Sequence, residues 1–284
     1  TKDEDGTVIN KTASYAGDGG LQQVFAGVGF KVLDNLSIGA NISYIYGDIT
    51  HSVTTAFSNS SSFSSVRLDK ISINDYKLDF GLQYSYKFNK KHVLNFGAVY
   101  SLGHSVNGKG YKYNQKWLNG ADYPSTQTGD TITNAFSLPH TFGAGLTYVY
   151  DNRLTIGADF TYQQWEDAKF YNEKSYFSNR TKIAAGAEFV PNPYSRNYLK
   201  RVRYRVGGYY SDPYTKVDGQ DGTREYGVSA GFGFPLFQSK SILNISGQYV
   251  RVSPKVKGML EENYLKINIG LTFNERWFMK WKVD

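Results

Sequence analysis

One serine motif is the clearest chemical signature in this chain. Gly227-Val228-Ser229-Ala230-Gly231 matches G-x-S-x-G, the nucleophile elbow of serine hydrolases. That elbow requires a sharp strand-to-helix turn, which exposes the serine. Ser229 instead lies in an alternating run that continues through Phe234. We therefore expect Ser229 to be an ordinary strand residue.

Metal and cofactor chemistry has little support. The chain has no cysteine, and none of its histidines forms an H-x-x-x-H pair. The histidines are His51, His92, His104 and His140. The acidic segments at residues 3–6 and 218–222 lack calcium-loop spacing. A barrel protease or phospholipase would need clustered Asp/His or Ser/His at a rim, and no such cluster is apparent, so we predict no enzyme, metal or cofactor.

Charged residues recur on the polar face of two neighbouring predicted strands. Arg201, Arg203 and Arg205 alternate on one strand, and Lys182 and Glu188 lie on its neighbour. Inward-facing cations could guide an anionic solute or a carboxylate head group. A network of paired interior charges explains the same pattern, and we favour it. The net charge of +7 is scattered over the chain, so we predict no nucleic-acid partner.

Apolar residues in two long loops are candidates for weak capture of a hydrophobic ligand at the mouth of a lumen. These residues are Phe57, Phe63, Tyr111, Tyr113 and Trp117. Trp165 lies beside Gln163 and Gln164 near the outer end of a strand. It could touch a ligand, but an anchor at the membrane interface is the favoured interpretation.

The elements that would position these residues are strands with a period of two. In the stretch from Asp75 to Gly103, Leu78, Phe80 and Leu82 alternate with small or polar residues. The same pattern recurs along the chain and predicts about eleven strands. Short turns such as Asp34-Asn35 alternate with long loops at 48–74 and 105–136. Loops that are short at one rim and long at the other are typical of an outer-membrane β-barrel.

Composition agrees with a thin apolar shell around a polar interior. Only 40% of residues are apolar, but 16% are aromatic, and 29 are glycine. No stretch is long and apolar enough for a transmembrane helix. We predict an all-β, antiparallel transmembrane barrel in the outer membrane of a Gram-negative bacterium, surrounded by lipid and lipopolysaccharide. Residues 1–20 are expected to form a loop that leads into a barrel over 21–284.

The predicted strand count is odd, although bacterial single-chain barrels have an even number of strands. The last strand ends at the short-turn rim, but the first strand starts at the long-loop rim. An odd number of strands is therefore expected before Thr1, roughly three for a common barrel size.

Two segments resemble a known family. Gly19–Ile49 and Asn263–Asp284 resemble the FadL/TodX family of outer-membrane transporters for hydrophobic compounds, in its Bacteroidota branch. This resemblance implies a barrel of about fourteen strands, an N-terminal hatch and lateral release through a kinked strand, with hatch and kink upstream of Thr1. No ligand-binding residue is carried over from the family.

Two functions follow as hypotheses. The first is passive uptake of long-chain fatty acids or other hydrophobic compounds. The alternative is a non-transporting accessory subunit of a larger outer-membrane complex, such as the β-barrel assembly machine or a secretion apparatus. In the second case the long loops 48–74 and 105–136 would contact partner proteins.

Overall fold

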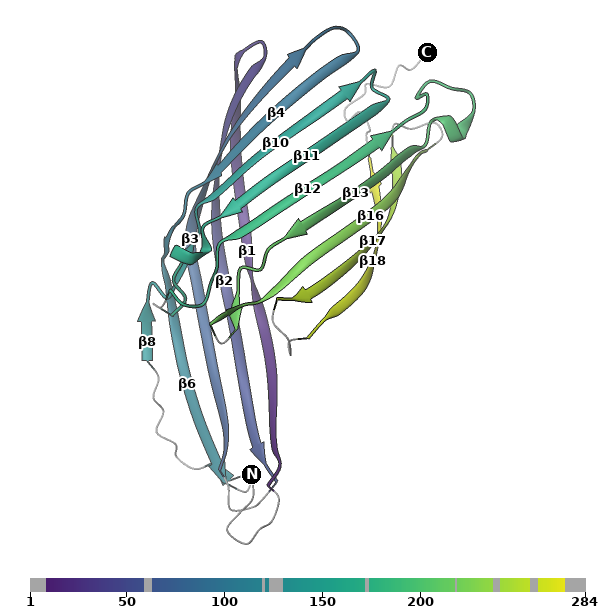
Figure 1. The fold of residues 1–284 in the computed structure, drawn as a ribbon. Helices are drawn as coiled ribbons and strands as arrows, with labels where there is room; N and C mark the ends of the chain where they lie inside the picture. Colours follow the sequence, from purple (N-terminus) through teal and green to yellow (C-terminus); the bar gives the residue numbers. More distant parts are fainter. Residues whose placement is uncertain are drawn as a thin grey trace, which may run out of the picture.

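A single antiparallel sheet forms the body of the protein (Figure 1). The computed structural model describes residues 9–58, 63–118, 121–122, 130–171, 174–217, 219–236, 241–255 and 260–273. Eleven strands pair in sequence order, as predicted. They are β1 (Lys11–Leu33), β2 (Leu36–Phe57), β3 (Ser64–Lys87), β4 (His92–Ser101), β10 (Thr141–Tyr150), β11 (Leu154–Gln163), β12 (Arg180–Phe189), β13 (Arg203–Ser211), β16 (Thr223–Pro235), β17 (Ile242–Pro254) and β18 (Glu262–Thr272).

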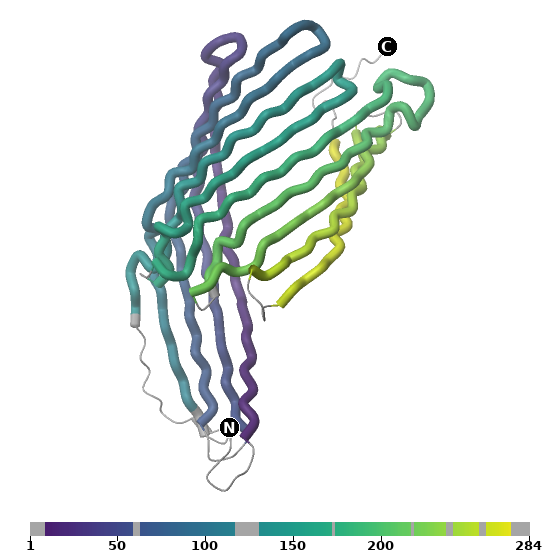
Figure 2. The backbone as a smooth tube through the Cα atoms, viewed as in Figure 1, coloured from purple at the N-terminus to yellow at the C-terminus, as the bar shows by residue number. Residues whose placement is uncertain are grey.

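The sheet is tilted and curled, but its two edges do not meet (Figure 2). Within the described residues, β1 pairs only with β2, and β18 pairs only with β17. β1 runs from the long-loop end to the short-turn end, and β18 also ends at the short-turn end, as predicted. The total number of strands in the closed barrel stays a prediction. No helix among the described residues is long and apolar enough to cross a membrane.

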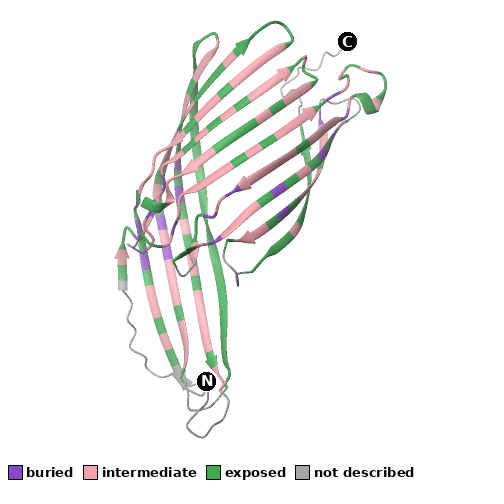
Figure 3. Cartoon of the chain, viewed as in Figure 1, coloured by how far each residue is buried: buried purple, intermediate pink, exposed green. Residues whose placement is uncertain are grey.

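One face of the sheet is apolar and exposed, and Figure 3 shows exposed residues recurring along the strands. Phe80 is 47% exposed and Leu82 is 39% exposed, so neither packs against a second sheet. Other exposed members of this face are Ile42, Phe142, Leu146, Ile156, Phe160, Ile183, Val206, Val228, Phe232, Tyr249, Ile267 and Ile269. Such an area of exposed apolar surface is typical of a barrel wall that faces lipid. The predicted orientation of the two faces is confirmed.

The inner face is lined by small and polar residues. Gly39, Gly81, Val99 and Gly143 lie side by side across four strands. A side chain added at Gly81 would meet nothing within 4 Å. The inner wall is therefore open at Gly81, whereas a Cβ on Gly143 would lie 2.5 Å from Val99 Cγ2.

Tight turns close the hairpins at one rim. Asp151 and Asn152 both have positive φ, 52° and 53°, which is the geometry of a type I′ hairpin turn. Asp34-Asn35 connects β1 to β2, as predicted from its sequence, although neither residue has a positive φ. The connection from β12 to β13 is longer and contains the short helix η2 (Tyr198–Lys200).

At the other rim the strands continue where loops were predicted. β2 and β3 stay in register as far as Thr55 and Ser65, and Lys11–Gly20 pairs with the end of β2. Beyond the barrel, β6 (Gly108–Leu118) replaces β4 as the neighbour of β3. The predictions of a lead-in loop over 1–20 and of long loops over 48–74 and 105–136 are therefore wrong for these strand residues. Ser and Thr on both faces conceal the period of two, but Thr, Val and Ile still favour strands.

We call residues 11–20, 48–57, 64–74 and 108–118 the strand extension. It projects from the barrel as a ribbon in the order β1, β2, β3, β6 (Figure 1). Short strands β7 (Ala121–Asp122) and β8 (Asp130–Thr133) pair with β6. The remaining small strands are β5 (His104–Val106), β9 (Phe136–Leu138), β14 (Lys216–Val217) and β15 (Gln220–Asp221).

Two glycines mark the junction between the barrel and the extension. Gly19 has φ of 96° and Gly47 has φ of 145°, and the two lie on adjacent strands. A Cβ on Gly47 would lie 2.2 Å from the carbonyl oxygen of Gly20. The backbone pairing of β1 with β2 can continue through this junction only because both residues lack a side chain.

Gly47→Val is expected to weaken the extension by about 2 kcal/mol, because it forces a strained φ and a backbone clash. Trypsin should then cleave at Arg67 and Lys70 roughly thirty times faster, through local opening. Gly97→Ala is the control, since a Cβ there meets nothing within 4 Å. Equal cleavage rates in the two variants would contradict the role of Gly47.

Candidate functional site

Three predicted charges meet on the inner face near the short-turn rim. Arg205 Nε donates to Glu188 Oε2 at 2.6 Å, and Arg203 Nη1 donates to Glu188 Oε1 at 3.0 Å. Arg205 Nη1 also donates to Asn244 Oδ1 at 2.7 Å. We call Glu188, Arg203, Arg205 and Asn244 the charged wall. The register brings these residues together, because Glu188 faces Arg205 across β12 and β13.

The other two predicted lumen residues lie outside the charged wall. Lys182 shares the inner face of β12, but its Nζ lies 5.0 Å from the ring centroid of Tyr209 at the far end of the strand. Arg201 does not belong to β13, so that part of the prediction is wrong. Asn197 accepts a hydrogen bond from the Leu199 amide and starts η2, and Arg201 caps the end of that turn.

A polar hollow of about 320 Å³ lies beside the charged wall. Its polar lining consists of Arg205, Ser229, Asn244, Ser246, Gln248 and Asn268. Two guanidinium groups facing one carboxylate leave a net positive charge at this point. The hollow can hydrogen-bond a polar or anionic group, but it does not provide an apolar slot for an acyl chain.

Glu188→Gln is expected to destabilise the barrel by about 1 kcal/mol, since it leaves two guanidinium groups close together without their counter-charge. The temperature at which the folded band disappears on an SDS gel should fall by about 2–4 °C. Asp159→Asn is the control, because Asp159 lies on the inner wall and forms no ion pair within the described residues. A fall of the same size in the control would contradict the pairing.

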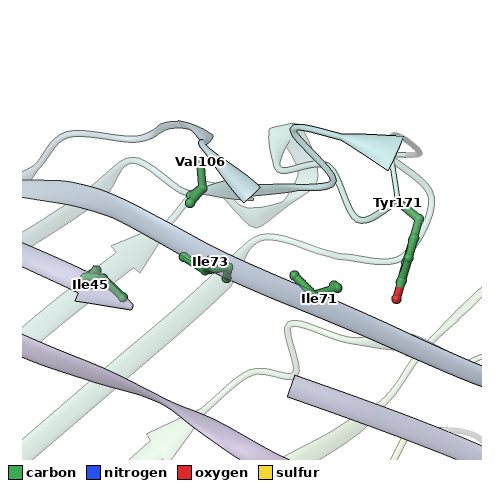
Figure 4. Packing of buried hydrophobic residues seen from close by; sticks show 5 residues of the cluster. All are labelled: Ile45, Ile71, Ile73, Val106 and Tyr171. Atoms are coloured by element: carbon green, nitrogen blue, oxygen red, sulfur yellow. The ribbon is translucent and has the colours of Figure 1, made fainter. Parts of the chain in front are cut away.

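Near the long-loop rim, segments fold onto the inner face of β2 and β3. Ile45, Ile71 and Ile73 point to the lumen side of β2 and β3 and are buried under Val106 and Tyr171 (Figure 4). We call this packed region, with β5, β9 and residues 165–171 and 174–177, the mouth cap. Ile132, Phe136, Leu138 and Phe170 pack against it. The cap is the main buried hydrophobic cluster of the described residues.

Trp165 belongs to the mouth cap and not to the membrane interface. It lies in η1 (Trp165–Asp167), with its ring centroid 5.2 Å from that of Phe177 and 5.1 Å from that of Tyr214. Its Nε1 donates to Gln163 Oε1 at 3.1 Å. The anchor interpretation does not fit this position, because the half-buried indole packs against Phe177 and Tyr214 within the cap.

Two histidines fix the ends of the mouth cap. His104 stacks on Tyr76 with ring centroids 4.6 Å apart, and its Nε2 lies 3.4 Å from Asp75 Oδ2. His140 Nδ1 lies 2.8 Å from the Tyr100 hydroxyl and accepts from the Gly103 amide at 3.2 Å. No cluster suited to a metal occurs in the described part of the chain.

The predicted capture residues do not form a lumen mouth. Tyr111 and Tyr113 share a face with Lys70 and Leu68, opposite the face that the cap covers. Phe57 and Phe63 lie at the tip of the extension, at the ends of β2 and β3. The backbone of Trp117 pairs with Ser64, and its side chain lies outside the described residues. These residues lie away from the lumen because the segments predicted to be loops continue as strands of the extension.

The serine motif has the structural context expected for a strand. Ser229 lies in the middle of β16, and its hydroxyl donates to the Gly207 carbonyl at 3.4 Å. No strand-to-helix turn follows it within the described residues. This geometry lacks the exposed turn that a nucleophile elbow needs.

Asp221 ties together three loops next to the mouth cap. It accepts hydrogen bonds from Ser178 Oγ at 2.6 Å and from Lys255 Nζ at 2.8 Å. These two bonds, first the one from Lys255 and then the one from Ser178, lower the pKa of the Asp221 carboxyl. A lowered folded-state pKa means that the bond network stabilises the loops above the ordinary pKa of about 4 and is lost as the pH falls through the folded value.

Asp221→Asn is expected to speed amide hydrogen exchange around Ser178 at pH 7 by about three- to tenfold, because an ionic tie of roughly 1 kcal/mol is lost. Acidification of the wild type through the lowered folded-state pKa of Asp221 should also reduce the protection of these amides, relative to their intrinsic exchange rate at the same pH. Asp167→Asn is the control, since its contact with Lys174 is long, at 3.5 Å, and solvent-exposed. Unchanged hydrogen exchange in Asp221→Asn would contradict the role of Asp221 in holding these loops together.

The tilted sheet, the lipid-facing outer surface and the tight turns at one rim define an outer-membrane β-barrel of the FadL type. A FadL homologue of Pseudomonas aeruginosa is 17% identical, with a TM-score of 0.56, over 84% of this chain and 61% of that chain. The toluene transporter TbuX of Ralstonia pickettii is 11% identical, with a TM-score of 0.55, over 91% and 69% of the two chains. The RagAB peptide importer has a TM-score of 0.52 at 11% identity, over 91% of this chain and 34% of that chain.

These identities establish the fold alone, and the chain spans 61% and 34% of the lengths of the FadL homologue and the RagAB chain. None of the curated proteins compared matches the sequence. A model of the BamG family matches residues 1–284, so the chain belongs to the BamG family. The predicted FadL-like fold and outer-membrane location are confirmed, but the Bacteroidota branch is not tested.

Proposed function

We propose that this chain is a structural, non-transporting subunit of the β-barrel assembly machine in the outer membrane. The observation that carries the proposal is the strand extension, which continues the barrel wall past the long-loop rim as an ordered sheet. The name of the BamG family links the family to that machine and supports this choice of complex.

A sheet suits partner binding better than free loops, because its backbone is already ordered before association. The extension carries an ion pair between neighbouring strands, Lys70 with Asp48 at 3.0 Å, and one within β3, Arg67 with Asp69 at 2.9 Å. Its uncapped face presents Tyr111, which is 37% exposed, next to Tyr113. Tyrosine is enriched in protein interfaces, which makes this face the proposed contact with another subunit.

The mouth cap favours a scaffold over a conduit. Its aromatic residues pack on lumen-facing isoleucines at the rim where a ligand would enter. Entry by that route would require the Ile71–Tyr171 packing to separate, which exposes apolar surface to water. The proposal includes no catalytic role, since Ser229 lies within a strand.

The test is recovery of partners when the full-length protein is purified from native membranes in mild detergent. The wild type should bring down another barrel protein or a lipoprotein in stoichiometric amount. Tyr111→Glu with Tyr113→Glu should lower that recovery about tenfold, because charge enters the centre of the contact face. Asn114→Glu, on the opposite face of β6, is the control. A wild-type protein that purifies alone would contradict the proposal.

Uptake of hydrophobic compounds is the second candidate. The FadL-type fold and the glycine-lined inner wall favour it, since small residues leave space for a ligand. Under this alternative, the purified protein should release a stoichiometric acyl chain or hydrocarbon, detected by mass spectrometry. Partner recovery without such a ligand supports the scaffold, and a stoichiometric ligand without a partner supports transport.

A further inference from the structure

The connection between β12 and β13 differs from the other turns at the short-turn rim. Asp34-Asn35 and Asp151-Asn152 make minimal turns, whereas residues 190–202 form a longer segment that contains η2. We call residues 190–202 the rim hook. In Figure 1 it stands at the same rim as the tight turns, between β12 and β13.

The rim hook has a fixed shape. The Asn192 amide donates to the Lys200 carbonyl at 2.8 Å, which closes the segment into a loop. Asn192 Oδ1 accepts from the Tyr194 amide at 3.0 Å, and the Tyr204 hydroxyl donates to the Leu199 carbonyl at 3.1 Å. Val190 and Val202, at its two ends, are buried at 5% and 1% exposure. The exposed residues between them are therefore presented by an ordered backbone.

The exposed chemistry of the rim hook is aromatic and cationic. Tyr194 is 92% exposed and Leu199 is 64% exposed. Arg196 and Lys200 are exposed and add two positive charges, Arg201 is half-buried with its guanidinium over the Tyr198 ring, and residues 190–202 contain no Asp or Glu. An exposed aromatic residue with cations and no anions complements an acidic surface.

The position of the rim hook places it in water. Phe189 and Tyr204 are paired at the ends of β12 and β13 and belong to the outer, lipid-facing set. The hook follows these residues along the chain and so lies beyond the lipid-facing band. Short turns of outer-membrane barrels face the periplasm, so Tyr194 and Leu199 are exposed to that compartment. Apolar side chains displayed there are typical of a binding site.

We propose that the rim hook docks an acidic surface of a periplasmic protein that belongs to the same complex. This inference rests on the proposed function as a complex subunit. Inner-leaflet phosphates also attract cations, but an ordered loop with Tyr194 at its tip has the features of a protein hot spot, where a rigid aromatic residue fills a pocket on the partner. The cations then fix orientation and speed association.

A zero-length carbodiimide cross-linker tests the inference directly, since it joins amines only to carboxylates in contact. In the complex purified with the full-length protein, Lys200 should be joined to Asp or Glu of a partner subunit, as identified by mass spectrometry. Lys90 and Lys91, at a tight turn on the same rim, should give far fewer links. Cross-links from Lys200 that are no more frequent than those from Lys90 would overturn the inference.

Variants provide the second readout. Arg196→Glu with Lys200→Glu, and separately Tyr194→Ala, should lower recovery of the cross-linked partner about tenfold. Lys90→Glu with Lys91→Glu is the charge-matched control and should leave recovery unchanged.

If the complex forms but hook variants do not weaken it, the inference fails and the proposed function stands. If the hook variants instead lose only binding to phosphatidylglycerol vesicles, lipid is the ligand and the inference is overturned. A wild-type protein without any partner contradicts both.

Discussion

The structure depends on one constraint, which is that each strand places apolar residues on one face and small or polar residues on the other. The apolar face, with Phe80 and Leu82 exposed, has no second layer to cover it, so only lipid can remove it from water. A shift of one residue in register would move the apolar set into the lumen. The registers of β2 with β3 and of β16 with β17 are long and unbroken because such a shift would be energetically unfavourable.

The barrel wall ends differently at its two rims, and this difference determines where the proposed contact surfaces lie. At the long-loop rim the wall continues as the strand extension, and the mouth cap covers its lumen side. At the other rim, tight turns end the hairpins, except where the rim hook interrupts them. The charged wall lies between, around Glu188, where two arginines share one carboxylate. A rigid body with separate outer and periplasmic contact surfaces is the arrangement that a scaffold subunit needs.

Strands with strict alternation could be predicted from the sequence, because lipid on one side imposes the period of two. The strand extension could not be predicted in this way, because the serines and threonines near residues 58–65 hide the period of two. A usable signal was present in Ile45, Ile71 and Ile73, which are apolar at lumen-facing positions and so mark where the inner face is covered. The pairing of Glu188 with Arg203 and Arg205 was favoured from the sequence. Arg201 was misplaced, because the Asn197 cap that starts η2 was not recognised.

The central claim is tested most directly by measuring which side chains touch lipid. Single cysteines at Phe80, Gly81, Leu82 and Gln83 would carry a bimane label, in vesicles that contain brominated lipid. We predict strong quenching at positions 80 and 82 and little at 81 and 83, because the latter face the lumen. Equal quenching at all four positions, or quenching of 81 and 83 instead, would contradict the lipid-facing assignment and the barrel built on it.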